Sequence, residues 1–394
     1  MKKIIMSCIC MMVILFCSWS QDSQDNMVDT FIANFKRGNA EVKLQVIKDA
    51  QGMNIPGMGP LYLEAVNYII NNNQLLEKDI TYRKLSIAAV EALKSEKYVK
   101  AKDSLWNLFK IDSNAQVRMG ILQAMADIAA GDSKMIANIN DWLESQNTIF
   151  KGGRTPDLQV IYTCIETLGK LGDPSSFMVL FHCLLRKYTD VILVKTDEAI
   201  KMLKGDFKQL YTVAIMNGTF EEKKFALTRV INDKAFSDKD KCDIAEFTLN
   251  VALNTTLNST EEKALARETR YQAVNFLSEK KWSNSTQLVI AHFNQVIADM
   301  DKGLATKNNL IDAIRALGNM QNHEAANRLT LYLDLINSYT ENGRVYDEQI
   351  VLAVIDSLKN LGDMVANGSL LYTKYLNYSD LVKKAATDAI KNLK

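Results

Sequence analysis

The sequence predicts an all-α fold, an α-solenoid of stacked antiparallel helix pairs, and three observations support this prediction. The chain has 394 residues and four prolines, and no proline follows Pro174. The part of the chain after this position therefore lacks the residue that most strongly breaks helices. Apolar residues recur at offsets of 3 and 7, which is the spacing of one helix face. Several of these segments also end in the same way, and the interval from Gly131 to Gly172 equals that from Gln321 to Gly362.

The N-terminal segment, residues 1–20, is predicted to be a secretory signal peptide of bacterial type. Lys2 and Lys3 precede an uncharged apolar run over residues 4–17, and small serines follow before the polar stretch QDSQDN. This run is shorter than the roughly 20 residues that a helix needs to span a bilayer. We expect cleavage after Ser20, so that residues 21–394 are exported to the periplasm or cell envelope.

Two alternatives to a cleaved signal peptide stay open. One is an uncleaved anchor. The other is a lipoprotein with a lipid on Cys17, whose Ser- and Asp-rich continuation would form a tether. Against the lipoprotein, bulky Phe16 stands where a lipidation motif has a small residue. No second apolar run approaches membrane length, so we expect no membrane span in the mature chain, with a lipid anchor at Cys17 as the possible attachment.

Charge and cysteine usage narrow the possible partners. Without Lys2 and Lys3, the 47 basic residues become 45 against 46 acidic ones. This balance offers no basic excess for a phosphate backbone, so we expect no nucleic-acid partner. Three cysteines remain, Cys164, Cys183 and Cys242, and no two form a CxxC pair. We interpret them as small buried hydrophobes, and a Cys164–Cys183 disulfide stays open.

The helical segments align on their C-terminal ends. The aligned segments are MGILQAMADIAAGD (119–132), IYTCIETLGKLGD (161–173), LIDAIRALGNMQN (310–322), VLAVIDSLKNLGD (351–363) and KKAATDAIKNL (383–393). Gly131-Asp132, Gly172-Asp173 and Gly362-Asp363 occupy one position, and Gln321-Asn322 replaces them in the third segment. Glycine after a helix adopts the left-handed conformation without strain. Asp or Asn then caps the next helix, and Pro174 is predicted at its first position.

Along the chain, helix pairs are predicted over residues 29–52 and 207–233, where the pattern is shorter and more divergent. Residues 98–204 and 285–394 carry the clearest repeats. Polar or glycine-rich breaks are predicted at residues 51–60, 150–157, 254–263 and 338–347. In a solenoid such insertions project from one rim, although a single loop is more often a linker than a binding site.

With these motifs and a period of roughly 40 residues, which is typical of two-helix solenoid repeats, the chain resembles the HEAT-repeat family. The resemblance rests on IYTCIETLGKLGDPSSFMVLFHCL, LIDAIRALGNMQNHEAANRLTLYL and IVLAVIDSLKNLGDMVANGSLLYTKYL, and on the Val117-Arg118 pair. It implies a right-handed α-solenoid of about eight to ten helix pairs over residues 21–394. It also implies a concave surface for a protein or peptide partner, although a degenerate repeat indicates a fold more firmly than a function.

Residues for catalysis or metal binding are not predicted. His182, His292 and His323 are far apart and show no zinc-binding spacing. A HEAT-like enzyme family, the deoxyhypusine hydroxylases, binds two iron atoms through several His-Glu pairs. This chain has one such pair, His323-Glu324, and we place Glu324 in the first turn of a helix. LGKLGDP lacks the order of a phosphate-binding loop. We therefore expect no enzyme activity, cofactor or metal.

Tyrosines are the candidate partner-binding residues. Tyr372, Tyr375 and Tyr378 recur every three residues, and Tyr332 and Leu335 have the same spacing. Tyrosine suits an interface because it buries area and keeps a polar tip, whereas packing between repeats is the alternative. The sequence thus favours a non-catalytic exported scaffold. The alternatives are a structural envelope lipoprotein anchored at Cys17 and, less favoured, a HEAT-like lyase or hydroxylase.

Overall fold

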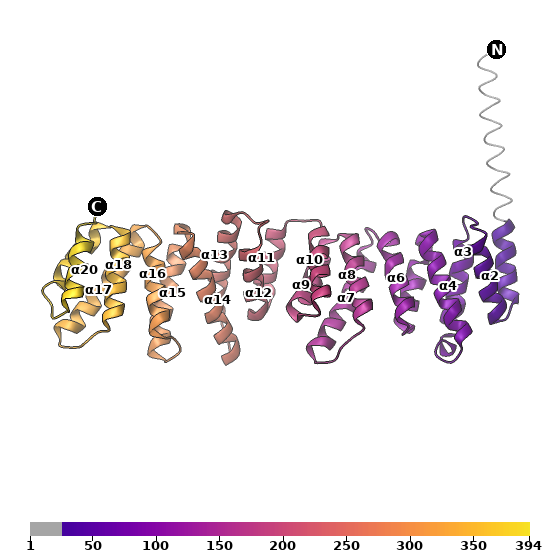
Figure 1. Cartoon of the computed structure of the whole chain (residues 1–394), viewed down its shortest axis with the longest axis horizontal. Helices are drawn as coiled ribbons and strands as arrows, with labels where there is room; N and C mark the ends of the chain where they lie inside the picture. Colours follow the sequence, from indigo (N-terminus) through magenta and orange to yellow (C-terminus); the bar gives the residue numbers. More distant parts are fainter. Residues whose placement is uncertain (1–25) are drawn as a thin grey trace, which may run out of the picture. The chain divides into compact units, whose positions relative to one another are not determined.

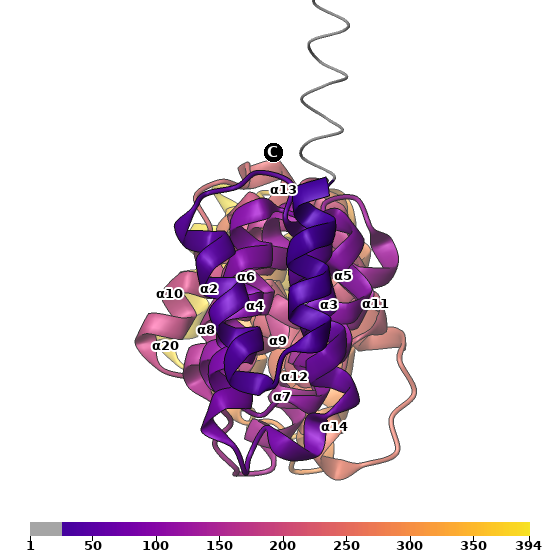
Figure 2. The ribbon, with the colours of Figure 1, turned by 90° about the vertical axis from the view of Figure 1, so that its right-hand side faces the viewer.

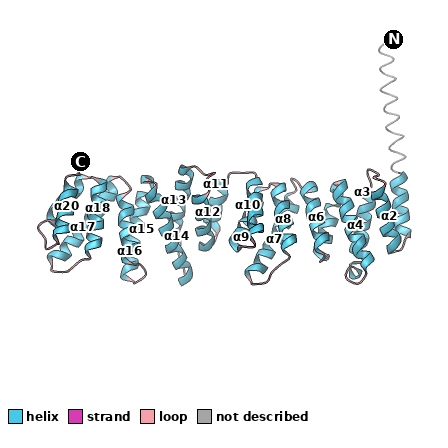
Figure 3. Cartoon of the chain, viewed as in Figure 1, coloured by secondary structure: helices cyan, strands magenta, loops and turns pink. Residues whose placement is uncertain are grey.

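The computed structural model describes residues 26–394 and confirms the predicted all-α, solenoid-like fold. Within this range the secondary structure consists of helices and loops without a strand (Figure 3). Most helices pack on their near neighbours in the chain. The predicted signal peptide, its cleavage at Ser20 and the possible lipid site at Cys17 lie outside the described residues.

The chain divides into two compact units, with the boundary after Gly205. In unit 1 the described residues form five helix pairs. Its helices are residues 26–37, α2 (Ala40–Gly52), α3 (Gly59–Asn71), α4 (Ile80–Glu96), α5 (Lys102–Ile111), α6 (Ala115–Ile128), α7 (Ser133–Lys151), α8 (Leu158–Leu171), α9 (Phe177–Arg186) and α10 (Asp190–Met202).

Unit 2, Asp206–Lys394, also contains five helix pairs. Its helices are α11 (Phe207–Asn217), α12 (Phe220–Asn232), α13 (Asp238–Asn254), α14 (Thr260–Glu279), α15 (Thr286–Asp301), α16 (Lys307–Gly318), α17 (His323–Glu341), α18 (Glu348–Leu361), α19 (Asn367–Thr373) and α20 (Asp380–Ile390).

Each unit has two layers of helices. In unit 1, α2, α4, α6, α8 and α10 pack on one another in chain order (Figure 1), and α3 with α5, and α7 with α9, belong to the second layer. Figure 2 shows α2 and α3 beside each other at the start of this unit. In unit 2, the even-numbered helices α12 to α20 form one layer and the odd-numbered helices α11 to α19 the other. A hydrophobic core runs between the layers of unit 2 from Leu227 to Ala389.

The predicted turns between helix pairs are confirmed. Gly172 and Gly362 are left-handed, with φ of 66° and 67°, and Gln321 adopts φ of 53° in place of a glycine. Asp173 then accepts a hydrogen bond from the backbone N–H of Ser175, as expected of a cap. A difference is that Pro174 opens a short 3-10 turn before α9 begins at Phe177, and Met364 opens a similar turn before α19.

The predicted apolar stripes face the core. Met125, Leu168, Leu317 and Leu358 are fully buried, whereas Ile390 in the last helix is half-buried. All three cysteines in the described range are buried free thiols. Their interpretation as small core residues agrees with this burial.

The two units are built alike. The bounds of α17 and α18 are those of α7 and α8 moved along the chain by one constant interval, from 133 to 323 and from 158 to 348. Buried Asn147 donates to the carbonyl of Val179 at 3.2 Å, and buried Asn337 donates to the carbonyl of Ser369 at 3.1 Å. The recurrence of LGD therefore reflects a repeated five-pair unit as well as a repeated helix pair.

A cysteine and a threonine have the same role in the two units. Cys183 donates its thiol to Oδ1 of Asn147 at 3.2 Å, and Thr373 donates its hydroxyl to Oδ1 of Asn337 at 3.2 Å. The pKa of the Cys183 thiol is raised to about 12, chiefly by burial. Cys183 is therefore a hydrogen-bond donor in the core.

A buried lysine caps the C-terminal end of the first helix in each unit. Lys43 Nζ donates to the carbonyls of Phe35 and Lys36, and Lys223 Nζ donates to those of Ile215 and Met216. These carbonyls belong to the last turns of their helices and have no partner within the helix. Burial lowers the pKa of both lysines. Each ammonium group thus caps a helix from the neighbouring one.

Close packing between α16 and α18 leads to a first prediction. A Cβ atom on Gly318 would lie 2.7 Å from the Cβ of Ser357 and 2.9 Å from its Cα. Because α18 would have to move, Gly318→Ala is expected to lower the free energy of unfolding by about 1–3 kcal/mol in urea denaturation. Gly368→Ala is the matched control. Its Cβ would meet no atom within 4 Å, and it is expected to stabilise by about 0.5–1 kcal/mol. Equal effects of the two substitutions would contradict the prediction.

Candidate functional site

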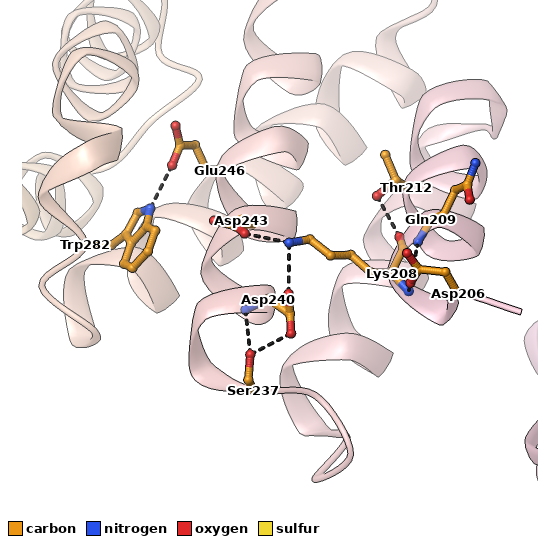
Figure 4. Close-up of polar contacts among 9 residues, drawn as sticks. All are labelled: Asp206, Lys208, Gln209, Thr212, Ser237, Asp240, Asp243, Glu246 and Trp282. Atoms are coloured by element: carbon orange, nitrogen blue, oxygen red, sulfur yellow. Dashed lines mark hydrogen bonds and ion pairs between the residues drawn. The ribbon is translucent and has the colours of Figure 1, made fainter.

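Two sets of polar contacts in unit 2 link α11 to α13 and α13 to the turn after α14 (Figure 4). Lys208 Nζ lies 2.9 Å from Oδ1 of Asp240 and 2.6 Å from Oδ2 of Asp243, and Trp282 Nε1 donates to Glu246 at 2.7 Å. Hydrogen bonds to the two aspartates raise the pKa of Lys208. Each acidic group drawn on α13 thus has a partner on a neighbouring element, and these contacts link the packed helices.

The three histidines are separate from one another. His182 on α9 is half-buried, with Nδ1 2.9 Å from Glu144 Oε2 on α7. His292 is buried inside α15, and His323 is exposed at the start of α17 with Nδ1 2.8 Å from Asp363 Oδ2. Glu324 lies in the first turn of α17, as predicted. No group of three or more His, Cys, Asp or Glu residues within residues 26–394 is arranged to hold a metal ion.

A pocket of about 540 Å³ opens between the α17–α18 and α19–α20 loops of unit 2. Lys307 and Asp347 form an ion pair on its wall at 3.0 Å, and this hydrogen bond lowers the pKa of Asp347. Arg344 lies with its guanidinium 5.3 Å from the ring centre of Tyr339, which stacks on Tyr346. The lining therefore contains two tyrosines, Tyr346 and Tyr378, together with charged residues of both signs.

The three candidate tyrosines differ in their exposure and in their hydrogen bonds. Tyr378 lines the pocket, and its hydroxyl donates to Asn337 and accepts from Thr340, so it belongs to the packing of the helix pairs. Tyr372 is 40% exposed and donates to Glu341 at 2.6 Å, and this hydrogen bond is the main cause of its raised pKa. Tyr375 is 78% exposed. Tyr372 and Tyr375 therefore remain available for contact.

Other exposed apolar residues lie on the same pair of helices. Leu331 and Leu335 are one turn apart on α17, 57% and 46% exposed, and Leu371 is exposed on α19. Since α17 packs against α19, we define the α17–α19 surface as Leu331, Leu335, Leu371, Tyr372 and Tyr375. Tyr332, which the sequence pattern coupled with Leu335, is buried instead.

Sequence reasoning missed Leu331. It lies between Leu329 and Leu333, which are both fully buried, and two residues correspond to about 200° around a helix. An apolar residue in this position points away from the core face. An alternating leucine pattern within a helical segment was therefore the available signal for an exposed contact.

Carboxylates surround the α17–α19 surface. Glu324, Asp334 and Glu341 are exposed on α17, and none of them forms an ion pair with another residue of the described part of the chain. Arg328, a basic residue of the same helix, is directed to Asn294 and to the ring of Phe293. The surface thus combines apolar side chains with unneutralised negative charge.

Comparison with known proteins found no family model and no curated protein that matches this chain. Among the helices of residues 26–394, none combines the length and the apolar character that a membrane crossing requires.

Proposed function

We propose that the chain is an exported, non-catalytic scaffold of the HEAT-repeat class that binds a protein or peptide partner through the α17–α19 surface. The observation that carries this proposal is the exposure of five apolar residues on two adjacent helices and the turn that ends the second of them. Exposed apolar groups on neighbouring helices are typical of an interaction site, and aromatic residues are enriched in such sites. The apolar N-terminal segment supports export.

Photocrosslinking in the source organism tests the scaffold proposal. A photoreactive phenylalanine analogue replaces Leu335 on α17 or, as a matched control, Ser145 at the corresponding position of α7. We expect one discrete crosslinked partner from position 335 and none from position 145. The crosslink should disappear when Leu331→Asp is added, because an aspartate removes part of the apolar contact.

Equal crosslinking at both positions, or none at position 335, would show that this surface has no specific partner. Mass spectrometry of the same purified protein is expected to find an N-terminus at Gln21. A lipid on Cys17 would instead favour the alternative, a structural envelope lipoprotein, while leaving the crosslinking result valid.

A further inference from the structure

The repeated architecture supplies a reference for the α17–α19 surface. Because α7 and α17 have the same length and the same place in their units, each exposed position of one has a counterpart in the other. Leu331 and Leu335 correspond to Asp141 and Ser145, which are also exposed. The fold thus accepts polar residues at these positions, and packing within the unit does not require the leucines of α17.

The ends of the two helices carry opposite charges. Glu324 and Glu341, near the two ends of α17, correspond to Lys134 and Lys151 of α7. On α7 the exposed side is polar and carries both signs of charge. On α17 the same side carries two leucines and Asp334 in its centre and a glutamate near each end. This combination distinguishes unit 2 from unit 1, although the backbone of the two helices is equivalent.

We propose that the α17–α19 surface binds a basic amphipathic helix of a partner protein. This inference rests on the proposed scaffold function and specifies the chemistry of its partner. Apolar side chains of the partner would pack on Leu331, Leu335 and Tyr375. Its lysines or arginines would lie opposite Glu324, Asp334 and Glu341.

The spacing of the apolar residues supports a helical partner. Leu331 and Leu335 are four residues apart on α17, and residues at this interval form a ridge along a helix. Leu371 lies on α19, and Tyr375 lies in the turn that follows this helix. An added helix can pack against this ridge and the neighbouring apolar side chains of α19 and its turn, in the same way that α17 and α19 pack on each other. We expect lysines or arginines at the edges of the bound helix, because acidic residues placed opposite the three carboxylates of α17 would be repelled.

Two synthetic peptides test the proposal with the purified full chain. The first has about 16 residues, with leucines at helical offsets of 3 and 4 and lysines on the other face. The second has glutamate in place of each lysine. Fluorescence anisotropy at about 0.1 M salt is expected to show at least tenfold tighter binding of the lysine peptide. The preference should fall as salt is raised, because the exposed charges are screened.

Three variants locate the binding. Leu331→Asp with Leu335→Ser introduces the residues of α7 and is expected to weaken the lysine peptide at least tenfold. Glu324→Lys with Glu341→Lys is expected to reduce or reverse the preference between the peptides. Asp141→Asn, on α7, should change neither. Thermal unfolding of the two α17 variants should match that of the unaltered chain, since α7 already carries the introduced residues at the corresponding positions. Asp141→Asn should match it as well, since the side chain at this position is exposed.

Several results would overturn the proposal. It is wrong if both peptides bind alike, or if the leucine substitutions leave binding unchanged. It is also wrong if sedimentation shows a dimer that Leu331→Asp with Leu335→Ser dissociates, because the occupant is then a second copy of the chain. A specific crosslink at position 335 together with no preference for the lysine peptide would retain the scaffold function and reject only the basic helix.

Discussion

Replacing Asp299 by leucine is expected to lower the free energy of unfolding by about 3–5 kcal/mol. Asp299 on α15 and Arg270 on α14 form an ion pair at 2.8 Å, and both side chains are only 6% exposed. Gln295 donates to the other carboxylate oxygen at 2.9 Å. Removing the carboxylate leaves the guanidinium buried without a counter-charge, which costs far more than the pair itself contributes. Chemical denaturation of the purified chain measures the change.

The double variant Arg270→Met with Asp299→Leu is the control. Because both charges are then removed, its stability is expected to return to within about 1–2 kcal/mol of the original chain. A comparable buried contact in unit 1 joins the hydroxyl of Ser86 to the carboxylate of Asp112 at 3.0 Å. The Asp112 carboxylate accepts from two neutral donors, this hydroxyl and the backbone N–H of Asn114, and Arg118 donates to the backbone carbonyl of Asp112, which leucine retains. Asp112→Leu should therefore cost only about 1–3 kcal/mol. A loss from Asp299→Leu no larger than that from Asp112→Leu would show that the ion pair is not effectively buried.

Acidification from pH 6.5 to pH 3 is expected to destabilise unit 2 through His292. Burial, assisted by the charge of Arg270, lowers the pKa of His292 from 6.5 to about 3. Below pH 6.5 the unfolded chain binds a proton at this histidine and the folded chain does not, so stability is lost as the pH falls. The loss ends near pH 3, where the folded state also becomes protonated. Its total is about 3–5 kcal/mol.

His292→Leu isolates this contribution. The carboxyl groups of Glu144 and Asp363 also have lowered pKa values, so stability declines in acid for other reasons as well. Denaturation of both proteins at intervals between pH 7 and pH 3 gives the difference that belongs to His292. As the pH falls, we expect the free energy of unfolding of the variant to rise steadily relative to that of the original chain. Parallel curves would mean that His292 titrates normally.

The helices and turns were predictable because their signals are local. An apolar residue at every third or fourth position indicates a helix wherever it occurs. In Gly172-Asp173, the glycine ends one helix and the aspartate caps the next. The different roles of Tyr375 and Tyr378 were not predictable. Both follow the same three-residue spacing, and only the position of Asn337 on another helix decides which hydroxyl is held inside.

The candidate site was predictable only in part, for the same reason. The exposure of a residue depends on which neighbouring elements pack on its helix face. A sequence pattern identifies an apolar face but does not identify the element that packs on it. The lysine caps show a similar limit. Lys43 and Lys223 look like ordinary surface charges in the sequence, but each is directed to carbonyl groups of the preceding helix.

The buried thiols make the stability of each unit separately measurable. Burial raises the pKa of Cys164 and Cys183 in unit 1, and that of Cys242 in unit 2 to about 11. A thiol of this kind reacts with an alkylating reagent only when its surroundings open, since the thiolate is the reactive form. The labelling rate of Cys242 therefore reports the opening of unit 2, and those of Cys164 and Cys183 report unit 1. Native alkylation read by mass spectrometry can thus follow partner binding, because a ligand on α17 and α19 should slow labelling in unit 2 alone.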